Sequence, residues 1–128
     1  MSGKSFEDLI AWQKTRILVR KVHEVSNKGL FKKDYSLRNQ ICRASVSAMS
    51  NVAEGFEREG DKEFVQFLSQ AKASCGEVRS QLYIAHDLGY MDQNEFKALH
   101  ETASEASKVI SGLIGYLKES EHRGSKFK

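Results

Sequence analysis

The feature that most limits what this chain can fold into is a pair of seven-residue apolar repeats in its second half. In each repeat the apolar positions step by three or four residues, which places them along one stripe of a helix. The first series is Phe64, Leu68, Ala71, Cys75, Val78, Leu82 and Ala85, and the second is Phe96, Leu99, Ala103, Ala106, Ile110, Leu113 and Leu117. A short Leu-Gly-Tyr segment at 88–90 separates them. We therefore expect two long helices that pack antiparallel.

Local signals mark where these two helices begin and end. Asp61 and Glu63 carry the negative charge that suits the start of the first helix. Gly89 is suited to the left-handed residue that ends it. Asp92 and Glu95 have the spacing of a capping box, which predicts the start of the second helix.

The first half of the chain predicts two further helices. One is expected over residues 6–27, with Ser5 as its N-cap and Asp8 completing a capping box. An irregular basic loop is expected at 27–34, because asparagine and glycine interrupt the apolar pattern there.

The next predicted helix has its own boundary signals and its own apolar stripe. Asp34 or Ser36 can cap its first turn, and it is expected to stop near Gly60. Its apolar stripe is formed by Leu37, Ile41, Ala44, Ala48, Val52 and Phe56.

Four amphipathic helices with short connections predict an all-α fold, an antiparallel up-down-up-down four-helix bundle. The chain has 128 residues, which suits one domain, expected over residues 1–119. Residues 120–128 lack apolar periodicity and are expected to form a disordered C-terminal tail. The start of the chain is charged, unlike a signal peptide, and no stretch reaches the roughly 18 apolar residues of a membrane span. These features predict a soluble, cytoplasmic protein with no membrane association.

The sequence carries no recognisable catalytic motif. The glycine-rich phosphate-binding patterns, G-x-S-x-G and H-E-x-x-H are all absent. Ser45, Ser47 and Ser50 have no identifiable base, and small hydroxyl residues on a helix more often allow close helix approach. Cys42 and Cys75 occupy apolar helix positions, as reduced core cysteines do. We therefore expect a non-enzymatic protein without a metal or cofactor.

Charge is distributed unevenly along the chain, although the formal net charge is only +3. Residues 14–33 contain a single acid, whereas residues 54–63 are predominantly acidic. The basic residues of the first segment are Lys14, Arg16, Arg20, Lys21, Lys28, Lys32 and Lys33. A basic helix face followed by a basic loop fits a phosphate backbone, so these seven are candidate nucleic-acid-binding residues. The alternative is a solvated face, or contact with the acidic segment of a neighbouring subunit.

Polar residues border the core stripe of the second predicted helix. The residues are Arg43, Ser47, Asn51 and Glu54 on this helix and Glu77 and Gln81 on the next. Their spacing by three or four places them on one helix side, and desolvated polar groups need partners. We expect a mostly dry polar layer that sets helix register, with an ion pair between Arg43 and Glu77. The alternative is a solvated groove that serves a ligand.

Four segments of the chain carry a family resemblance. They are FEDLIAWQKTRILVRKVHEV, LRNQICRASVSAMSNVAEGFER, FLSQAKASCGEVRSQL and LGYMD. Over residues 6–117 the chain resembles the 23S rRNA intervening-sequence proteins. The resemblance implies an antiparallel four-helix bundle that assembles as a ring-shaped bacterial homopentamer, with no catalytic residue. It also includes a distant branch of accessory proteins of diversity-generating retroelements, which bind nucleic acid and a reverse transcriptase.

Apolar residues outside the core stripes independently predict self-association. They are Val46 and Met49 on the second predicted helix and Val65, Phe67, Tyr83 and Ile84 on the third. This surplus predicts a homo-oligomer, and the number five comes from the resemblance alone. Two functions follow as expectations. The leading one is an oligomer that binds RNA or DNA, in particular structured RNA, through its basic face. The alternative is a protein-interaction scaffold, such as a ring-shaped accessory protein of a reverse transcriptase.

Overall fold

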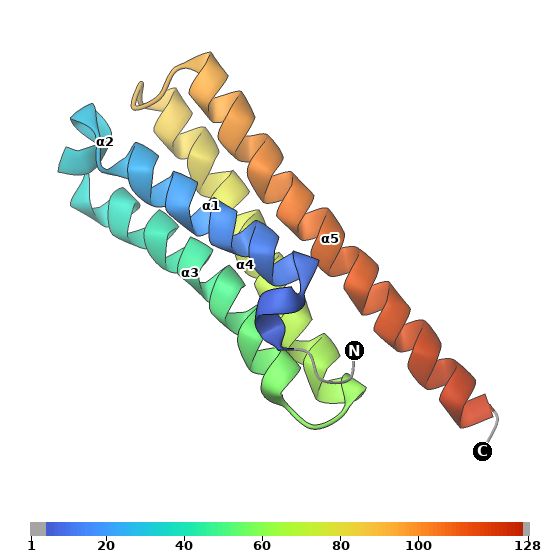
Figure 1. Cartoon of the computed structure of the whole chain (residues 1–128). Helices are drawn as coiled ribbons and strands as arrows, with labels where there is room; N and C mark the ends of the chain where they lie inside the picture. Colours follow the sequence, from blue (N-terminus) through green and yellow to red (C-terminus); the bar gives the residue numbers. More distant parts are fainter. Residues whose placement is uncertain (1–4, 127–128) are drawn as a thin grey trace.

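Four long helices form the molecule (Figure 1). The computed structural model describes residues 5–126, with side chains described for 5–120. The elements are the 3-10 turn η1 (Phe6–Asp8) and the helices α1 (Ile10–Ser26), α2 (Gly29–Lys33), α3 (Tyr35–Glu57), α4 (Asp61–Asp87) and α5 (Gln93–Lys126). No strand occurs in this part of the chain. The predicted all-α class is confirmed.

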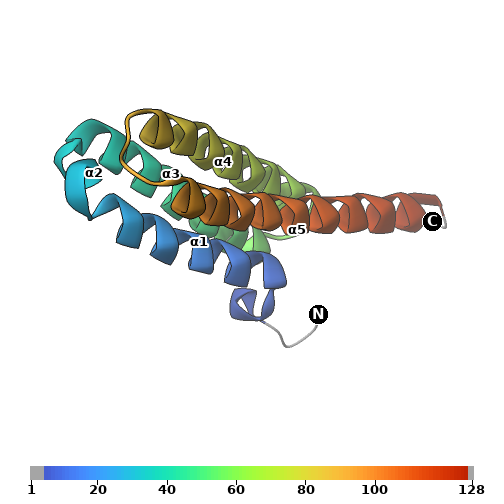
Figure 2. The ribbon, with the colours of Figure 1, turned by 90° about the horizontal axis from the view of Figure 1, so that it is seen from above.

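The long helices pack in a square, in which each contacts two others. Helix α1 lies against α3 and α5, and α4 lies against the same two helices. Successive long helices run in opposite directions, so the topology is the predicted up-down-up-down bundle (Figures 1 and 2). Four helix–helix interfaces therefore hold the bundle together.

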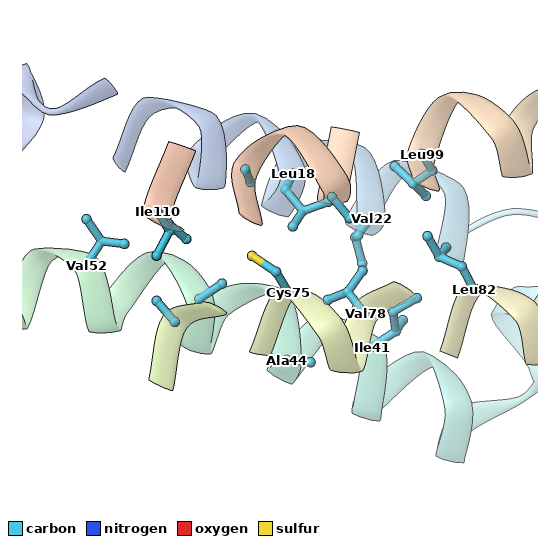
Figure 3. Close-up of a cluster of buried hydrophobic side chains, with 14 of the residues drawn as sticks. Leu18, Val22, Ile41, Ala44, Val52, Cys75, Val78, Leu82, Leu99 and Ile110 are labelled. Atoms are coloured by element: carbon cyan, nitrogen blue, oxygen red, sulfur yellow. The ribbon is translucent and has the colours of Figure 1, made fainter. Parts of the chain in front are cut away.

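The core between the helices is formed by the predicted apolar stripes (Figure 3). Leu82 of α4 and Ile110 of α5 are completely buried, as are Ile41 of α3 and Leu18 of α1. Each such side chain contributes about 1.5–3 kcal/mol relative to an exposed position. Within the two seven-residue apolar repeats, Phe64, Phe96 and Leu113 are only half-buried.

The turn between α4 and α5 has the geometry that its sequence predicts. Gly89 has a φ of 78°, and its N–H donates to the His86 carbonyl at 3.0 Å. The N–H of Tyr90 donates to the Ala85 carbonyl at 2.9 Å, which completes a Schellman motif. The Asp92 and Glu95 side chains each accept from the other residue's N–H, at 2.8 and 3.3 Å. The predicted capping box is confirmed.

The first helix begins later than the sequence indicates. The Asp8 carboxylate accepts from the Ser5 N–H at 3.1 Å, as expected, but this contact closes the 3-10 turn η1. Leu9 is then extended, with a ψ of 128°, and its side chain is buried. The Phe6 ring packs against Trp12 with centroids 5.2 Å apart. The predicted helix start near residue 6 is therefore wrong, because burying these apolar side chains turns the chain before Ile10.

The expected loop at 27–34 contains a short helix, α2. Its Phe31 side chain is buried and lies 5.4 Å from the Tyr90 ring. Asp34 caps α3 by accepting from the Leu37 N–H at 3.1 Å, and it also accepts from the Tyr90 hydroxyl at 2.8 Å. Of the two proposed caps, Asp34 is the one used. These contacts join α2 to the turn between α4 and α5.

Helix α5 continues past the other three helices (Figures 1 and 2). Its backbone is helical to Lys126, whereas the sequence predicts a disordered tail over residues 120–128. Glutamate, lysine and arginine have high helix propensity and can extend a packed helix beyond its last core contact. Residues 127 and 128 lie outside the described part of the chain, as do the side chains from residue 121 onward.

Candidate nucleic-acid interface

Three of the seven candidate basic residues point across to α5. Lys14 and Lys21 are seven residues apart and follow one edge of α1, and Lys28 lies just beyond its end, as the N-cap of α2. The Lys14 ammonium lies 2.5 Å from Glu105, and that of Lys28 lies 3.2 Å from Glu95. The Lys21 ammonium donates to the Thr102 hydroxyl at 3.5 Å. Nearly half of the predicted basic surface therefore forms a ladder between two helices.

The ladder affects the titration of one acid. The hydrogen bond from Lys14, followed by its charge, lowers the pKa of Glu105. Because the folded-state pKa lies below the unfolded value, this contact stabilises the fold above the unfolded pKa. Its contribution is lost as the pH falls through the folded pKa.

The other four candidates remain on the outside of the bundle. Arg16 and Arg20 are exposed on α1, where they line a shallow groove with Gln13 and Ile17. The Arg16 guanidinium lies 5.6 Å from the Trp12 ring centroid. Arg20 has only an exposed contact of 4.0 Å with Glu24, which is worth little in solvent.

Lys32 and Lys33 lie in the last turn of α2, and both are exposed. Neither forms an ion pair with any described residue. Arg38 of α3 donates to the Lys32 carbonyl at 3.2 Å and adds a third cation to this corner. The acidic segment at 54–63 lies at the opposite end of α3 (Figure 1). The cations of α2 and the acidic segment therefore lie at opposite ends of α3.

The polar residues between α3 and α4 do not form the expected dry layer. Arg43 and Glu77 are both exposed, and no ion pair joins them in the described structure. With Gln40, Ala44 and Ser47 they line an open groove. Long side chains at the edge of a helix pair can extend into water. The charges of Arg43 and Glu77 are therefore not buried, and removing one partner would not leave a costly buried charge.

A smaller set of contacts links α3 to α4 instead. The Ser74 hydroxyl donates to the Ser47 hydroxyl at 3.0 Å, and the Asn51 amide donates to the same oxygen at 3.1 Å. Glu54 turns away and pairs with Arg58 at 3.4 Å. Gln81 is buried, and its Oε1 has no hydrogen-bond partner among the described residues.

A further groove, between α4 and α5, was not predicted from the sequence. Lys72 and Arg79 of α4 and Lys118 of α5 line it, together with Ile114 and small residues of α4. Lys72 and Arg79 are seven residues apart and flank the apolar stripe of α4. That spacing is the signal that identifies a basic edge, but the sequence does not place Lys118 beside it.

Other site types find little support in the described residues. Burial raises the pKa of the Cys75 thiol to about 11, so it stays protonated and unreactive at neutral pH. Cys42 lies with its sulfur 3.3 Å from the Ser26 hydroxyl. Within the described residues, no three His, Cys, Asp or Glu side chains gather in a way that holds a metal ion. No described helix has the length and apolar character needed to cross a bilayer.

Comparison with known proteins adds a family and a fold. Over residues 7–112 the chain matches the sequence model of a family described as 23S rRNA-intervening sequence protein. A similar solved structure is that of a protein with unknown function from the S23 ribosomal protein family of Bacteroides thetaiotaomicron. It is 16% identical with a TM-score of 0.75, and the match covers 82% of this chain and 98% of that chain. At this identity the likeness concerns the fold alone. No curated protein matches the chain.

Proposed function

The chain belongs to the 23S rRNA-intervening sequence protein family, and from this premise we propose that it is a non-enzymatic oligomer that binds structured RNA. The observation that carries the proposal is the set of exposed cations on α1 and α2 that make no contact with α5. They are Arg16, Arg20, Lys32 and Lys33. Exposed cations favour the phosphate backbone of a folded RNA, because binding releases its condensed counterions.

The salt dependence of RNA binding tests this proposal. For a duplex, log K falls against log salt with a slope of about −0.9 per neutralised phosphate. Four contacts predict a slope of roughly −3 to −4, whereas all seven original candidates would predict about −6. The measurement is a fluorescence anisotropy titration of a labelled RNA hairpin between about 50 and 200 mM salt.

Two variants divide the basic residues by their surroundings. Replacing the four cations that make no contact with α5, Arg16, Arg20, Lys32 and Lys33, by glutamine is expected to remove most of the affinity and most of the slope. The control replaces Lys14, Lys21 and Lys28 by glutamine, and it is expected to change the slope little because these side chains already contact α5. Absence of hairpin binding by the parent protein at the lowest salt would refute the proposal.

We also propose that the chain forms a cyclic homo-oligomer. Val46 and Ile84 are exposed, while Met49, Val65 and Phe67 are half-buried. Exposed apolar side chains on two adjacent helices support an interface between copies, and five subunits remain an implication of the family resemblance. Light scattering at micromolar concentration tests this proposal, and a monomer would contradict it.

A scaffold for a protein partner is the second candidate function. The observation in its favour is that large apolar side chains are also exposed away from α3 and α4. Ile10 is 60% exposed, Leu30 60% and Tyr116 67%. A partner recovered in a pull-down after nuclease treatment would favour the scaffold. One that is lost on nuclease treatment would favour nucleic acid.

A further inference from the structure

The groove between α4 and α5 is lined by three cations, by small residues of α4 and by Ile114 of α5. Lys72 and Arg79 lie on the α4 side, Lys118 lies on the α5 side, and Ala73 and Gly76 line the space between them. The groove is open to solvent and has a volume of about 510 Å³. A Cβ atom on Gly76 would lie 3.6 Å from Nη2 of Arg79, so the guanidinium lies close over this part of the helix.

The cations of this groove differ from Lys14 and Lys28, which pair with acids of α5. None of the residues lining the groove is acidic. No described residue forms an ion pair with Lys72, Arg79 or Lys118. Arg79 is half-buried, which brings its charge close to the groove floor while leaving its donors available to a ligand. Three cations around one concave surface without an acidic lining residue fit an anionic ligand.

An exposed aromatic ring lies one helical turn beyond Arg79. Tyr83 is 52% exposed, and its ring packs edge-on against Phe96 at 4.9 Å and His100 at 5.5 Å. These contacts hold the ring in place without covering it. Lys72, Arg79 and Tyr83 follow the same side of α4, with the two cations about 10 Å apart along the axis at 1.5 Å per residue. A polymer that carries both negative charges and planar rings matches this series of two cations and one aromatic ring.

We propose that the α4–α5 groove binds single-stranded nucleic acid. Lys72, Arg79 and Lys118 contact the backbone phosphates, and one base stacks on Tyr83. Axes of packed helices are about 8–10 Å apart, so the groove between them is too narrow for a duplex, whose bases would also be out of reach of the ring. This inference rests on the proposed function and deepens it, because it assigns unpaired strands to a surface separate from the α1–α2 cations.

The test uses two RNA probes and matched variants. The probes are a labelled oligouridine of about 12 nucleotides and a labelled RNA hairpin, titrated by anisotropy at about 50 mM salt and above. The groove variant is Lys72→Gln/Arg79→Gln/Lys118→Gln. Its control is Lys62→Gln/Lys97→Gln/Lys108→Gln, which removes the same charge from exposed lysines outside the groove. Tyr83→Ala removes the ring, and Tyr83→Phe keeps it.

The expected results separate the groove from general charge. The groove variant should bind oligouridine at least about tenfold more weakly, with a salt slope reduced by about 2 for three single-strand phosphates. The affinity of the control for oligouridine should stay within about twofold of the parent's. For comparison, a tenfold change corresponds to about 1.4 kcal/mol. Tyr83→Ala should lose about tenfold, which lies within the roughly 1–3 kcal/mol that one stacked base is worth, and Tyr83→Phe should bind like the parent. Hairpin binding should be nearly unchanged in all of these variants.

Several outcomes would overturn the inference. If the parent binds the hairpin but the groove variant binds oligouridine as the parent does, the groove is not the site, while the proposed function stands. If Tyr83→Ala retains full affinity, the groove binds anions without recognising bases, as it would an acidic peptide. If the groove variant changes the oligomeric mass in light scattering, the groove is an interface between copies. If the parent binds neither probe, both proposals fail.

Discussion

Phe31→Ala is expected to lower the free energy of unfolding by about 3–5 kcal/mol. Phe31 is 1% exposed and supplies the buried side chain of α2. Its ring packs on Tyr90, whose hydroxyl in turn reaches Asp34 at the start of α3. Removing it leaves a cavity where α2 meets the turn between α4 and α5. A helix of one turn has no stability of its own, so nothing else compensates for the loss.

The measurement is urea or thermal unfolding of the parent and the variant. For a chain of this size the change corresponds to roughly 10–20 °C in melting temperature. Leu30→Ala is the matched control, because Leu30 lies in the same short helix but is 60% exposed. Its effect is expected to stay within about 0.5 kcal/mol of the parent. Equal effects from the two variants would mean that α2 is not anchored through Phe31.

The same substitution also bears on RNA binding. Lys32 and Lys33 follow Phe31 directly, so their positions depend on α2 remaining docked. Under conditions where Phe31→Ala is still folded, hairpin affinity is expected to fall as well. Leu30→Ala should bind like the parent.

Gly55→Ala is expected to destabilise the protein by about 1–3 kcal/mol, although alanine is the better helix former. A Cβ at this position would lie 2.7 Å from the Cβ of Phe67 and 3.0 Å from the Phe64 ring. The first distance is shorter than real Cβ contacts, and the Phe67 atom belongs to the rigid base of a side chain. Helices α3 and α4 would have to move apart at this contact.

A glycine in an open position provides the control. A Cβ atom added at Gly112 of α5 would meet no neighbouring atom within 4 Å, and its helix can accept alanine. Gly112→Ala is therefore expected to stabilise the protein by up to about 1 kcal/mol. Opposite signs in thermal melts of the two variants would identify close packing at Gly55. A stabilising Gly55→Ala would show that α3 and α4 have room to adjust.

The long helices and their caps could be predicted from residues near each other in the chain. The stripe that contains Leu82 and the stripe that contains Ile110 repeat every seven residues, which is a property of each helix alone. The Schellman turn at Gly89 and the capping box at Asp92 likewise depend on residues within about one helical turn. These signals were sufficient for the fold class and for the boundaries of α4 and the start of α5.

The candidate site could be predicted only in part. The sequence identified seven cations in one segment, but it did not show that Lys14 and Lys28 meet acids of α5, far away in the chain. It paired Arg43 with Glu77 by matching spacings, although spacing alone does not say how deeply a groove is buried. The α4–α5 groove was not predicted at all. Lys72 and Lys118 lie on different helices, and the alignment of two helices cannot be read from the sequence of either helix alone.

What the sequence determined by itself is therefore the set of helices, their apolar faces and their main breaks, because periodicity and capping act within one or two turns. What only the tertiary structure decided is which polar side chains face each other across the grooves. It also decided that Phe31 orders α2, since the residues that bury its ring come from another part of the chain. Contacts of this kind depend on the register and depth at which helices pack, and these are set by the combined fit of all four core stripes.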